Sequence, residues 1–508
     1  MDISTLYKCF TECSGVTTDS RNCPEGSMFI ALKGETFNGN AFAAQALEKG
    51  CRYAVVDEEQ YAGENPHILL VDNCLRTLQE LANFHRRTLD TRIIGITGTN
   101  GKTTASNLLT DALEADGKRV LSNRAGSNIA SGISTTLLKG CDLLGRIRPY
   151  DLAVLEVDER SSPRIYPYVK PNYIIVTNLT RDSIMRNAHP AYIADILTRS
   201  IPAGATMILN ADDLIACSVS PGNPRVYFGI DRLPGDTAAC ENLIDDLRIC
   251  PRCSAKLTYL YRRYHHIGKA VCPQCGFHSP DSDYLATAVD MEHSAMSLLE
   301  NGTEHPYHLI SDSIPNLYNM VTVIAALRQL GYSHDRIAAL MAGLSITATR
   351  YQAEQAGHVT LIRQMSKDKN ALAGSRTFQY IAQRPGRKEL LLMMNNLGDA
   401  HHWSENTCWI FDADFEYLAD DSITQLVCTG ARCRDYRLRL LMAGVPEERI
   451  ICQPDEFRAA ECLRYTPGDD VYVLFGTDSM ALSYQVYDHM KQTALQRAAA
   501  QEENGEAQ

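Results

Sequence analysis

The sequence predicts an α/β protein built around a parallel sheet with helices on both faces. Between residues 92 and 210, short apolar segments alternate with amphipathic ones, and a second alternation of this kind begins near residue 346. A glycine-rich turn that ends in lysine follows the first apolar segment of the central block. Nearly continuous apolar strands separated by helices are typical of parallel sheets that are buried on both faces. At about 150 residues per domain, a chain of 508 residues predicts about three domains.

The composition is that of a folded protein with an acidic balance. Hydrophobic residues make up 45% and charged residues 22% of the chain, and 49 basic against 61 acidic side chains give a net charge of −12. This charge argues against nucleic acid or an anionic membrane as a partner. The N-terminal segment has no basic stretch before an apolar core, and no run of about 18 apolar residues occurs. The 17 cysteines are scattered, which favours reduced thiols. We therefore expect a cytoplasmic protein without a transmembrane segment.

Residues 1–88 are expected to form a small α/β unit of their own. Gly50 stands where a helix of this unit would end, a position that favours glycine. The expected elements of the unit are strands at 28–32 and 52–56 and helices at 41–50 and 73–89.

Two larger units follow, at 89–345 and 346–495. A cysteine-rich segment interrupts the first of them near residue 240, and we expect it to form an inserted ribbon at 248–280. The tail at 496–508 is polar and has almost no bulky apolar side chain, so we expect it to be disordered. The expected strands are 92–98, 151–157, 172–178, 205–210, 389–395, 422–430 and 470–476, and the clearest helices are 103–117 and 317–331.

The clearest functional pattern is a phosphate-binding loop between an expected strand and an expected helix. Glycines in such a loop let backbone N–H groups turn toward a phosphate, and the helix N-terminus adds partial positive charge. Lys102 supplies a full positive charge, and Thr103 or Thr104 can hold Mg²⁺. Ile96 occupies the first glycine position of the general pattern, so the match is imperfect. The residues of the loop are Gly98, Thr99, Asn100, Gly101, Lys102, Thr103 and Thr104.

A nucleotide site also needs an acidic residue for the metal ion. The expected strand at 151–157 ends with Glu156, and Asp158 and Glu159 follow directly. Parallel α/β sheets place their ligands at the carboxyl ends of the strands. Glu156 or Asp158 is therefore the candidate Mg²⁺ ligand.

Four cysteines have the spacing of a metal site. They form two C-x₂-C pairs that are separated by 18 residues, and Gly276 follows the second pair, where it permits a turn. This spacing predicts a tetrahedral Cys₄ zinc site with a structural role, whereas a redox pair is the alternative. The four residues are Cys250, Cys253, Cys272 and Cys275.

The loop TGTNGKTT, followed by LEVDE, TNLTRD and LNADD, resembles the Mur ligase family of ATP-dependent peptidoglycan-building enzymes. The resemblance implies a three-domain architecture with a Rossmann-like C-terminal domain, and it implies that ATP converts a substrate carboxylate into an acyl-phosphate, which an amine attacks. On this resemblance Glu156 holds Mg²⁺ and Asn319 contacts the adenine. Two positions depart from the amino-acid-adding members, which usually have histidine where Ser183 stands and asparagine where Thr322 stands.

Within the family, the chain resembles the MurT subunit of lipid II isoglutaminyl synthase. The cysteine ribbon after LNADD, the segment SENTCWIFDADFE and the segment CTGARCRDYRLRLLMAG carry this resemblance. It implies a GatD-like glutamine amidotransferase partner, whose Cys–His pair an Asp of the C-terminal domain completes. The block retains Asp412 and Asp414, of which Asp412 is the candidate for that role, whereas Asn406 occupies the first Asp position of the block. Residues 1–88 resemble the N-terminal domain of MurE and MurF, which holds a uridine diphosphate group and which MurT proteins ordinarily lack.

These observations leave three functions open. The first is an ATP-dependent amidoligase that activates a stem-peptide carboxylate, the D-glutamate of lipid II, for amidation with ammonia from the partner. The second is a MurE-like ligase that adds an amino acid to a UDP-N-acetylmuramoyl peptide. The third is a relative that binds nucleotide without turnover. The sequence does not distinguish a lipid-linked from a UDP-linked acceptor.

Overall fold

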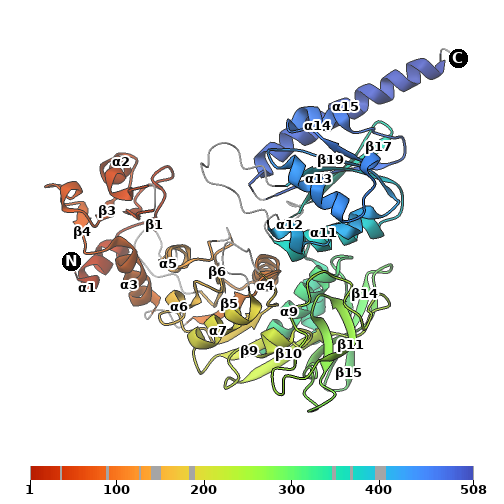
Figure 1. The fold of residues 1–508 in the computed structure, drawn as a ribbon. Helices are drawn as coiled ribbons and strands as arrows, with labels where there is room; N and C mark the ends of the chain where they lie inside the picture. Colours follow the sequence, from red (N-terminus) through yellow and green to blue (C-terminus); the bar gives the residue numbers. More distant parts are fainter. Residues whose placement is uncertain are drawn as a thin grey trace.

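The computed structural model describes residues 2–34, 37–86, 91–124, 127–138, 150–181, 189–345, 351–366, 370–394, 408–476 and 478–506. Three bodies follow one another along the chain (Figure 1). The N-terminal unit and the C-terminal unit lie at opposite ends of a larger central unit, so that the chain forms an open crescent.

The N-terminal unit is a parallel sheet with the strand order β1-β2-β3-β4. Its helix α1 begins after Asp2, whose carboxylate accepts hydrogen bonds from the N–H groups of Ser4 and Thr5. The elements are α1 (Ile3–Thr11), β1 (Val16–Thr17), β2 (Met28–Ile30), η1 (Gly39–Phe42), α2 (Ala43–Glu48), β3 (Tyr53–Val56), η2 (Glu59–Tyr61), β4 (Ile68–Leu70) and α3 (Cys74–Arg86).

The central unit has a nine-stranded sheet of order β15-β14-β13-β10-β9-β8-β5-β7-β6. Its strands are parallel except for β14 and β15, which pair antiparallel at one edge. A separate hairpin, β11–β12, stands apart from this sheet. The strands are β5 (Arg92–Thr97), β6 (Val120–Ser122), β7 (Leu152–Glu156), β8 (Tyr173–Val176), β9 (Thr206–Asn210), β10 (Arg225–Ile230), β11 (Thr258–Tyr264), β12 (Ile267–Val271), β13 (Tyr284–Asp290), β14 (Ala295–Glu300) and β15 (Thr303–His308). The helices are α4 (Lys102–Ala115), α5 (Ala130–Leu138), α6 (Ser162–Ile165), α7 (Pro190–Ser200), α8 (Leu214–Cys217), α9 (Ile314–Gln329) and α10 (His334–Ala342).

Both faces of the central sheet are buried, as its apolar strands predict. Ile94 and Ile96 of β5 belong to one core, together with residues of α4 and α9. Ile93 belongs to a second core that continues into the N-terminal unit, where α3 packs against α5. Successive side chains of β5 therefore point into two different cores, which hold the strand in place. The loop that follows β5 lies at the carboxyl edge of the sheet.

The C-terminal unit is a six-stranded sheet of order β16-β17-β21-β18-β19-β20, parallel except for the antiparallel pair β16–β17. Its elements are β16 (Tyr351–Ala356), β17 (Val359–Met365), α11 (Ala371–Gln383), β18 (Lys388–Met393), α12 (Trp409–Asp412), η5 (Phe415–Ala419), β19 (Ile423–Cys428), α13 (Cys433–Met442), η6 (Glu447–Arg449), β20 (Ile450–Cys452), α14 (Glu456–Cys462), β21 (Asp470–Phe475) and α15 (Met480–Glu506).

The expected disorder of the tail at 496–508 is wrong for the part that the structure describes. Helix α15 continues to Glu506. Alanine has the highest helix propensity, and Ala498 is buried beside the turn at Gly357. The guanidinium of Arg497 donates to the carbonyl oxygens of Leu463 and Glu461, which ties the helix to the C-terminal unit.

The predicted α/β fold class with parallel sheets is confirmed. The antiparallel extension β13–β14–β15 and the strands β16 and β17 were not predicted. The segments of β15 and β16 are too polar to show an apolar run. Across the described parts of the chain, no helix combines the length and apolar character that a membrane crossing needs.

Candidate functional site

The phosphate loop lies between β5 and α4 in a backbone conformation that two glycines permit. Gly98 has a φ of +125° and Gly101 a φ of +83°. A Cβ atom at Gly98 would lie 2.2 Å from Thr177 Oγ1, and one at Gly101 would lie 2.4 Å from Asn319 Oδ1. Both positions therefore require glycine, for conformational and for steric reasons.

A second polar segment, residues 177–180 directly after β8, forms hydrogen bonds with the loop. The N–H of Thr99 donates to the backbone oxygen of Asn178 at 2.8 Å. The N–H of Asn100 donates to Oδ1 of the same residue at 3.1 Å. Thr177 Oγ1 donates to the carbonyl oxygen of Asn100 at 2.6 Å, and Asn100 Nδ2 donates to Thr180 Oγ1 at 3.0 Å. These bonds hold the loop in one conformation. The sequence did not predict the residues that make them.

Lys102 lies at the first turn of α4 and is mostly buried. Its Nζ is 2.7 Å from Glu159 Oε1, which also accepts a hydrogen bond from the N–H of Gly98 at 2.8 Å. Burial lowers the pKa of Lys102, but the charge and hydrogen bond of Glu159 together with the charges of Asp158 and Glu156 outweigh burial, so its pKa lies above the ordinary value. Lys102 is therefore a permanent cation at the mouth of the loop. From sequence, Glu159 was expected directly after the strand at 151–157, and no role was assigned to it.

Of the two candidate magnesium ligands, one ends a strand and the other lies in the first turn of a helix. Glu156 ends β7, opposite Ile96 of β5, and it is 4% exposed. Its Oε1 accepts a hydrogen bond from Asn128 Nδ2 at 2.9 Å, which orients the carboxylate. Thr103 is the second residue of α4. A hydroxyl and a carboxylate are the oxygen donors that Mg²⁺ takes from proteins, so this pair fits the ion.

Asn319, predicted to contact adenine, lies on α9 directly beside the loop. It is 4% exposed, and its Oδ1 approaches Gly101 as described above. Its Nδ2 donates to Asn316 Oδ1 at 3.3 Å. Thr322, where the family has a second asparagine, uses its hydroxyl to bond the carbonyl oxygen of Tyr318 at 2.7 Å. Of the two, only Asn319 adjoins the phosphate loop.

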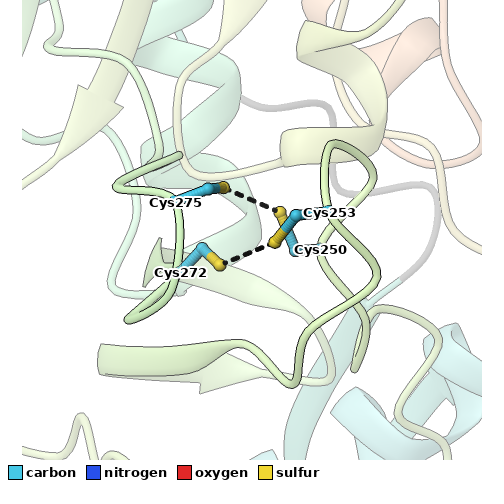
Figure 2. A group of neighbouring side chains, drawn as sticks. All are labelled: Cys250, Cys253, Cys272 and Cys275. Carbon is cyan, nitrogen blue, oxygen red and sulfur yellow. Dashed lines mark hydrogen bonds between the residues drawn. The ribbon is translucent and has the colours of Figure 1, made fainter.

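The four cysteines converge as their spacing predicts (Figure 2). Their sulfur atoms all lie within 4.8 Å of one another, with closest approaches of 3.7 Å for Cys250–Cys275 and 3.4 Å for Cys253–Cys272. Zn–S bonds of about 2.3 Å in a tetrahedron give sulfur–sulfur edges of about 3.8 Å, so the cluster fits this ion. Each pair turns at a positive φ, at Ser254 and at Gly276.

The candidate carboxylate of the third unit contacts the central unit. Asp412 ends α12, and its Oδ2 is 3.3 Å from Nη1 of Arg181, which belongs to the segment after β8. The Asp412 side chain is 25% exposed. Asn406 lies outside the described residues, as does Ser183.

Together these elements form a site suited to phosphate transfer. A rigid loop, the cation of Lys102 and the oriented carboxylate of Glu156 lie at one edge of a parallel sheet. A cation and a carboxylate are the groups that a nucleoside triphosphate and its metal ion need, and the third unit adjoins the same edge.

Family comparisons divide the chain into three matched segments. The family model described as "Mur ligase family, catalytic domain" matches residues 12–86, and the "Mur ligase middle domain" matches residues 96–231. The model "MurT ligase C-terminal" matches residues 368–480.

The fold and the loop define a nucleotide-dependent α/β ligase. A relative from Streptococcus pneumoniae, "Lipid II isoglutaminyl synthase (glutamine-hydrolyzing) subunit MurT", is 30% identical over 370 residues, which cover 70% of this chain and 78% of the relative. The chain belongs to the Mur ligase family, and it is an ATP-dependent carbon–nitrogen ligase with a C-terminal domain of the MurT type.

Solved structures agree in fold. MurF from Acinetobacter baumannii superposes with a TM-score of 0.67 at 17% identity, covering 94% of each chain. MurF from Thermotoga maritima in complex with ADP gives a TM-score of 0.65 at 15% identity, covering 96% of this chain and 99% of that one.

Proposed function

We propose that this chain is the ATP-dependent amidoligase subunit of a peptidoglycan-precursor amidating enzyme. It activates a stem-peptide carboxylate, the D-glutamate of lipid II, and a GatD-like glutamine amidotransferase supplies ammonia. The single observation that carries the proposal is the match of residues 368–480 to the MurT ligase C-terminal model. The relative named as a MurT subunit supports it, since its match extends over most of that subunit.

The residues of the site have distinct roles in this reaction. The cradle from Gly98 to Thr104, with Lys102, binds the phosphates, and Asn319 contacts the adenine. Thr103 and Glu156 would hold Mg²⁺, which neutralises charge on the phosphates. The substrate carboxylate takes the γ-phosphoryl group and ADP leaves. Ammonia then attacks the carbonyl carbon of the acyl-phosphate, loses a proton, and inorganic phosphate leaves.

The reaction is tested by trapping its activated intermediate. With lipid II, ATP and hydroxylamine in place of ammonia, we expect a hydroxamate on the D-glutamate carboxylate, because hydroxylamine captures acyl-phosphates. ATP hydrolysis without hydroxamate on any precursor would contradict the proposed activation.

A second candidate function has one observation in its favour. Residues 12–86 match a Mur ligase domain, and their four-stranded sheet packs on the central unit through α3 and α5. MurE and MurF hold a UDP group with such a domain, so a ligase that adds an amino acid to a UDP-muramoyl peptide is the alternative. Binding of UDP-muramoyl dipeptide but not lipid II, measured by calorimetry, would favour it. We also propose that the chain has three domains: an N-terminal domain at residues 1–88, a central domain at 89–345 and a C-terminal domain at 346–495.

Asp412 is the candidate that completes the partner's catalytic pair, because Asp414 is buried in a contact within the chain. Asp412→Asn in the complex with the amidotransferase is expected to lower glutamine-dependent amidation, since an amide orients a histidine base poorly. Amidation with added ammonium should change little. Equal loss with both nitrogen sources would show that Asp412 serves only its contact with Arg181.

We also propose that Cys250, Cys253, Cys272 and Cys275 bind one structural Zn²⁺. A closed Cys₄ shell leaves no position for water, so the ion stabilises the fold and takes no part in chemistry. Cys272→Ser is expected to remove the metal and to lower the thermal transition of the central unit, whereas exposed Cys408→Ser keeps both. Metal analysis of unchelated protein that finds no thiophilic ion would contradict this assignment.

A further inference from the structure

The segment that carries the cysteines also contacts the C-terminal unit. We call residues 231–283, between β10 and β13, the insertion. Its Asn242 Nδ2 donates to Asp414 Oδ2 at 2.9 Å, and the N–H of Leu243 donates to Asp414 Oδ1 at 2.7 Å. The Asp414 side chain is 4% exposed. A buried carboxylate is costly unless it is hydrogen-bonded, so this contact suits one orientation of the two units.

Asn242 is itself held by the hairpin of the insertion. The N–H of His265, at the tip of β11–β12, donates to Asn242 Oδ1 at 2.7 Å. Arg262 Nη1 lies 2.8 Å from Asp245 Oδ2, which ties β11 to the same loop. The amide that meets Asp414 is therefore fixed by a rigid hairpin rather than by a free loop.

A second contact, made by Arg181 of the segment after β8, links the insertion to the C-terminal unit. Arg181 Nε is 2.7 Å from Asp246 Oδ1 of the insertion, and Arg181 Nη1 is 3.3 Å from Asp412 Oδ2. Arg376 of α11 lies over the ring of Tyr264 of β11, 4.9 Å from its centroid. Figure 1 shows α11 and α12 beside this part of the central unit.

This orientation brings the C-terminal unit to the phosphate loop. Asn370, the N-cap of α11, donates from Nδ2 to Asn100 Oδ1 at 3.3 Å and is 4% exposed. Leu372, the second residue of α11, is part of the core of the central unit. The N-terminus of α11 therefore lies at the nucleotide loop in the orientation that the insertion favours.

We propose that the insertion is a positioning element that sets the C-terminal unit over the phosphate loop, and that Asp414 is its positioning residue. This role is separate from any metal-dependent stabilisation, because it acts through Asn242, Leu243 and Arg181. Its effect on turnover rests on the proposed ligase function, whereas its effect on domain orientation does not.

The test is a reciprocal exchange of the two side chains. Asn242→Asp places a carboxylate against the buried Asp414, and Asp414→Asn places an amide against the amide of Asn242. Each single variant is expected to increase the radius of gyration in X-ray scattering and to lower kcat about 10–100-fold, because small misplacements at a reacting centre are costly. The combined variant N242D/D414N restores a carboxylate–amide pair, so we expect both values to return toward those of the wild type.

Glu416→Ala is the matched control, because Glu416 pairs with Arg439 inside the C-terminal unit at 2.7 Å. It should change neither the scattering nor kcat. The proposal is overturned if Asn242→Asp leaves the scattering unchanged, or if N242D/D414N stays as expanded as the single variants. Since scattering needs no substrate, loss of the proposed amidation activity would not affect this result.

Discussion

Lys102→Ala is expected to lower ATP-dependent turnover about 10²–10³-fold, the usual cost of removing a preorganised electrostatic group from a transition state. The cation stands at the mouth of the loop, where it meets the phosphates, and it contributes little apolar packing. The measurement is release of inorganic phosphate with the precursor and ammonium present.

The variant also removes the partner of Glu159, so the loss of charge must be separated from disturbance of the fold. The double variant K102A/E159Q removes the unpaired carboxylate and should be as inactive as Lys102→Ala. Lys118→Ala, on the exposed turn after α4, is the control and should keep full turnover. Wild-type turnover in Lys102→Ala would rule out this loop as the nucleotide site.

Arg263→Met is expected to destabilise the central unit by about 3–5 kcal/mol, because it leaves the buried Asp236 without its counter-ion and leaves Asp212 with Lys269 alone. Arg263 lies on β11 with a fully buried side chain. Its Nη2 is 2.7 Å from Asp236 Oδ2, its Nη1 is 3.4 Å from Asp212 Oδ2, and Nη1 also donates to Tyr318 Oη at 2.5 Å. The measurement is the thermal transition of the central unit in differential scanning calorimetry.

A matched comparison separates buried from exposed ion pairs. Arg76→Ala breaks an exposed pair with Glu80 on α3 and should change stability by only about 0.3–0.5 kcal/mol. Adding Asp236→Asn to Arg263→Met should recover part of the loss, because it removes one of the uncompensated charges. Arg263→Met with the stability of the wild type would mean that these carboxylates do not depend on Arg263.

The phosphate loop and the cysteine site could be predicted because their chemistry is local in sequence. Glycine at positive φ, lysine at a helix start and paired C-x₂-C spacings need only a few neighbouring residues. The same holds for β5, β7 and β9, whose continuous apolar runs leave little alternative to a buried strand.

The remaining parts of the site depend on contacts between distant segments. Asn319 meets Gly101 only because α9 packs beside α4, and Asp414 meets Asn242 only because two units dock. Arg263 reads in sequence as part of a basic and aromatic run, TYLYRRY, and its burial between Asp212 and Asp236 follows from tertiary packing. Helix α15 was missed because its polar face hides the alanine positions that pack on the C-terminal unit.

The roles assigned to the C-terminal unit also shift with the structure. From sequence, Asp412 was the candidate for the partner's catalytic pair, and Asp414 was the alternative that the same block retains. The structure places Asp414 in a buried contact with the insertion and leaves Asp412 partly exposed beside Arg181. Packing thus narrows the choice to Asp412.

The central claim is that the chain amidates a precursor carboxylate with nitrogen from glutamine. The most direct measurement is mass spectrometry of lipid II after incubation with the chain, the glutamine amidotransferase from the same genome, ATP and ¹⁵N-amide glutamine. The account predicts lipid II in which a ¹⁵N amide replaces the D-glutamate α-carboxyl hydroxyl, and no product without ATP. Unchanged lipid II, together with addition of an amino acid to a UDP-muramoyl peptide by the chain alone, would contradict it.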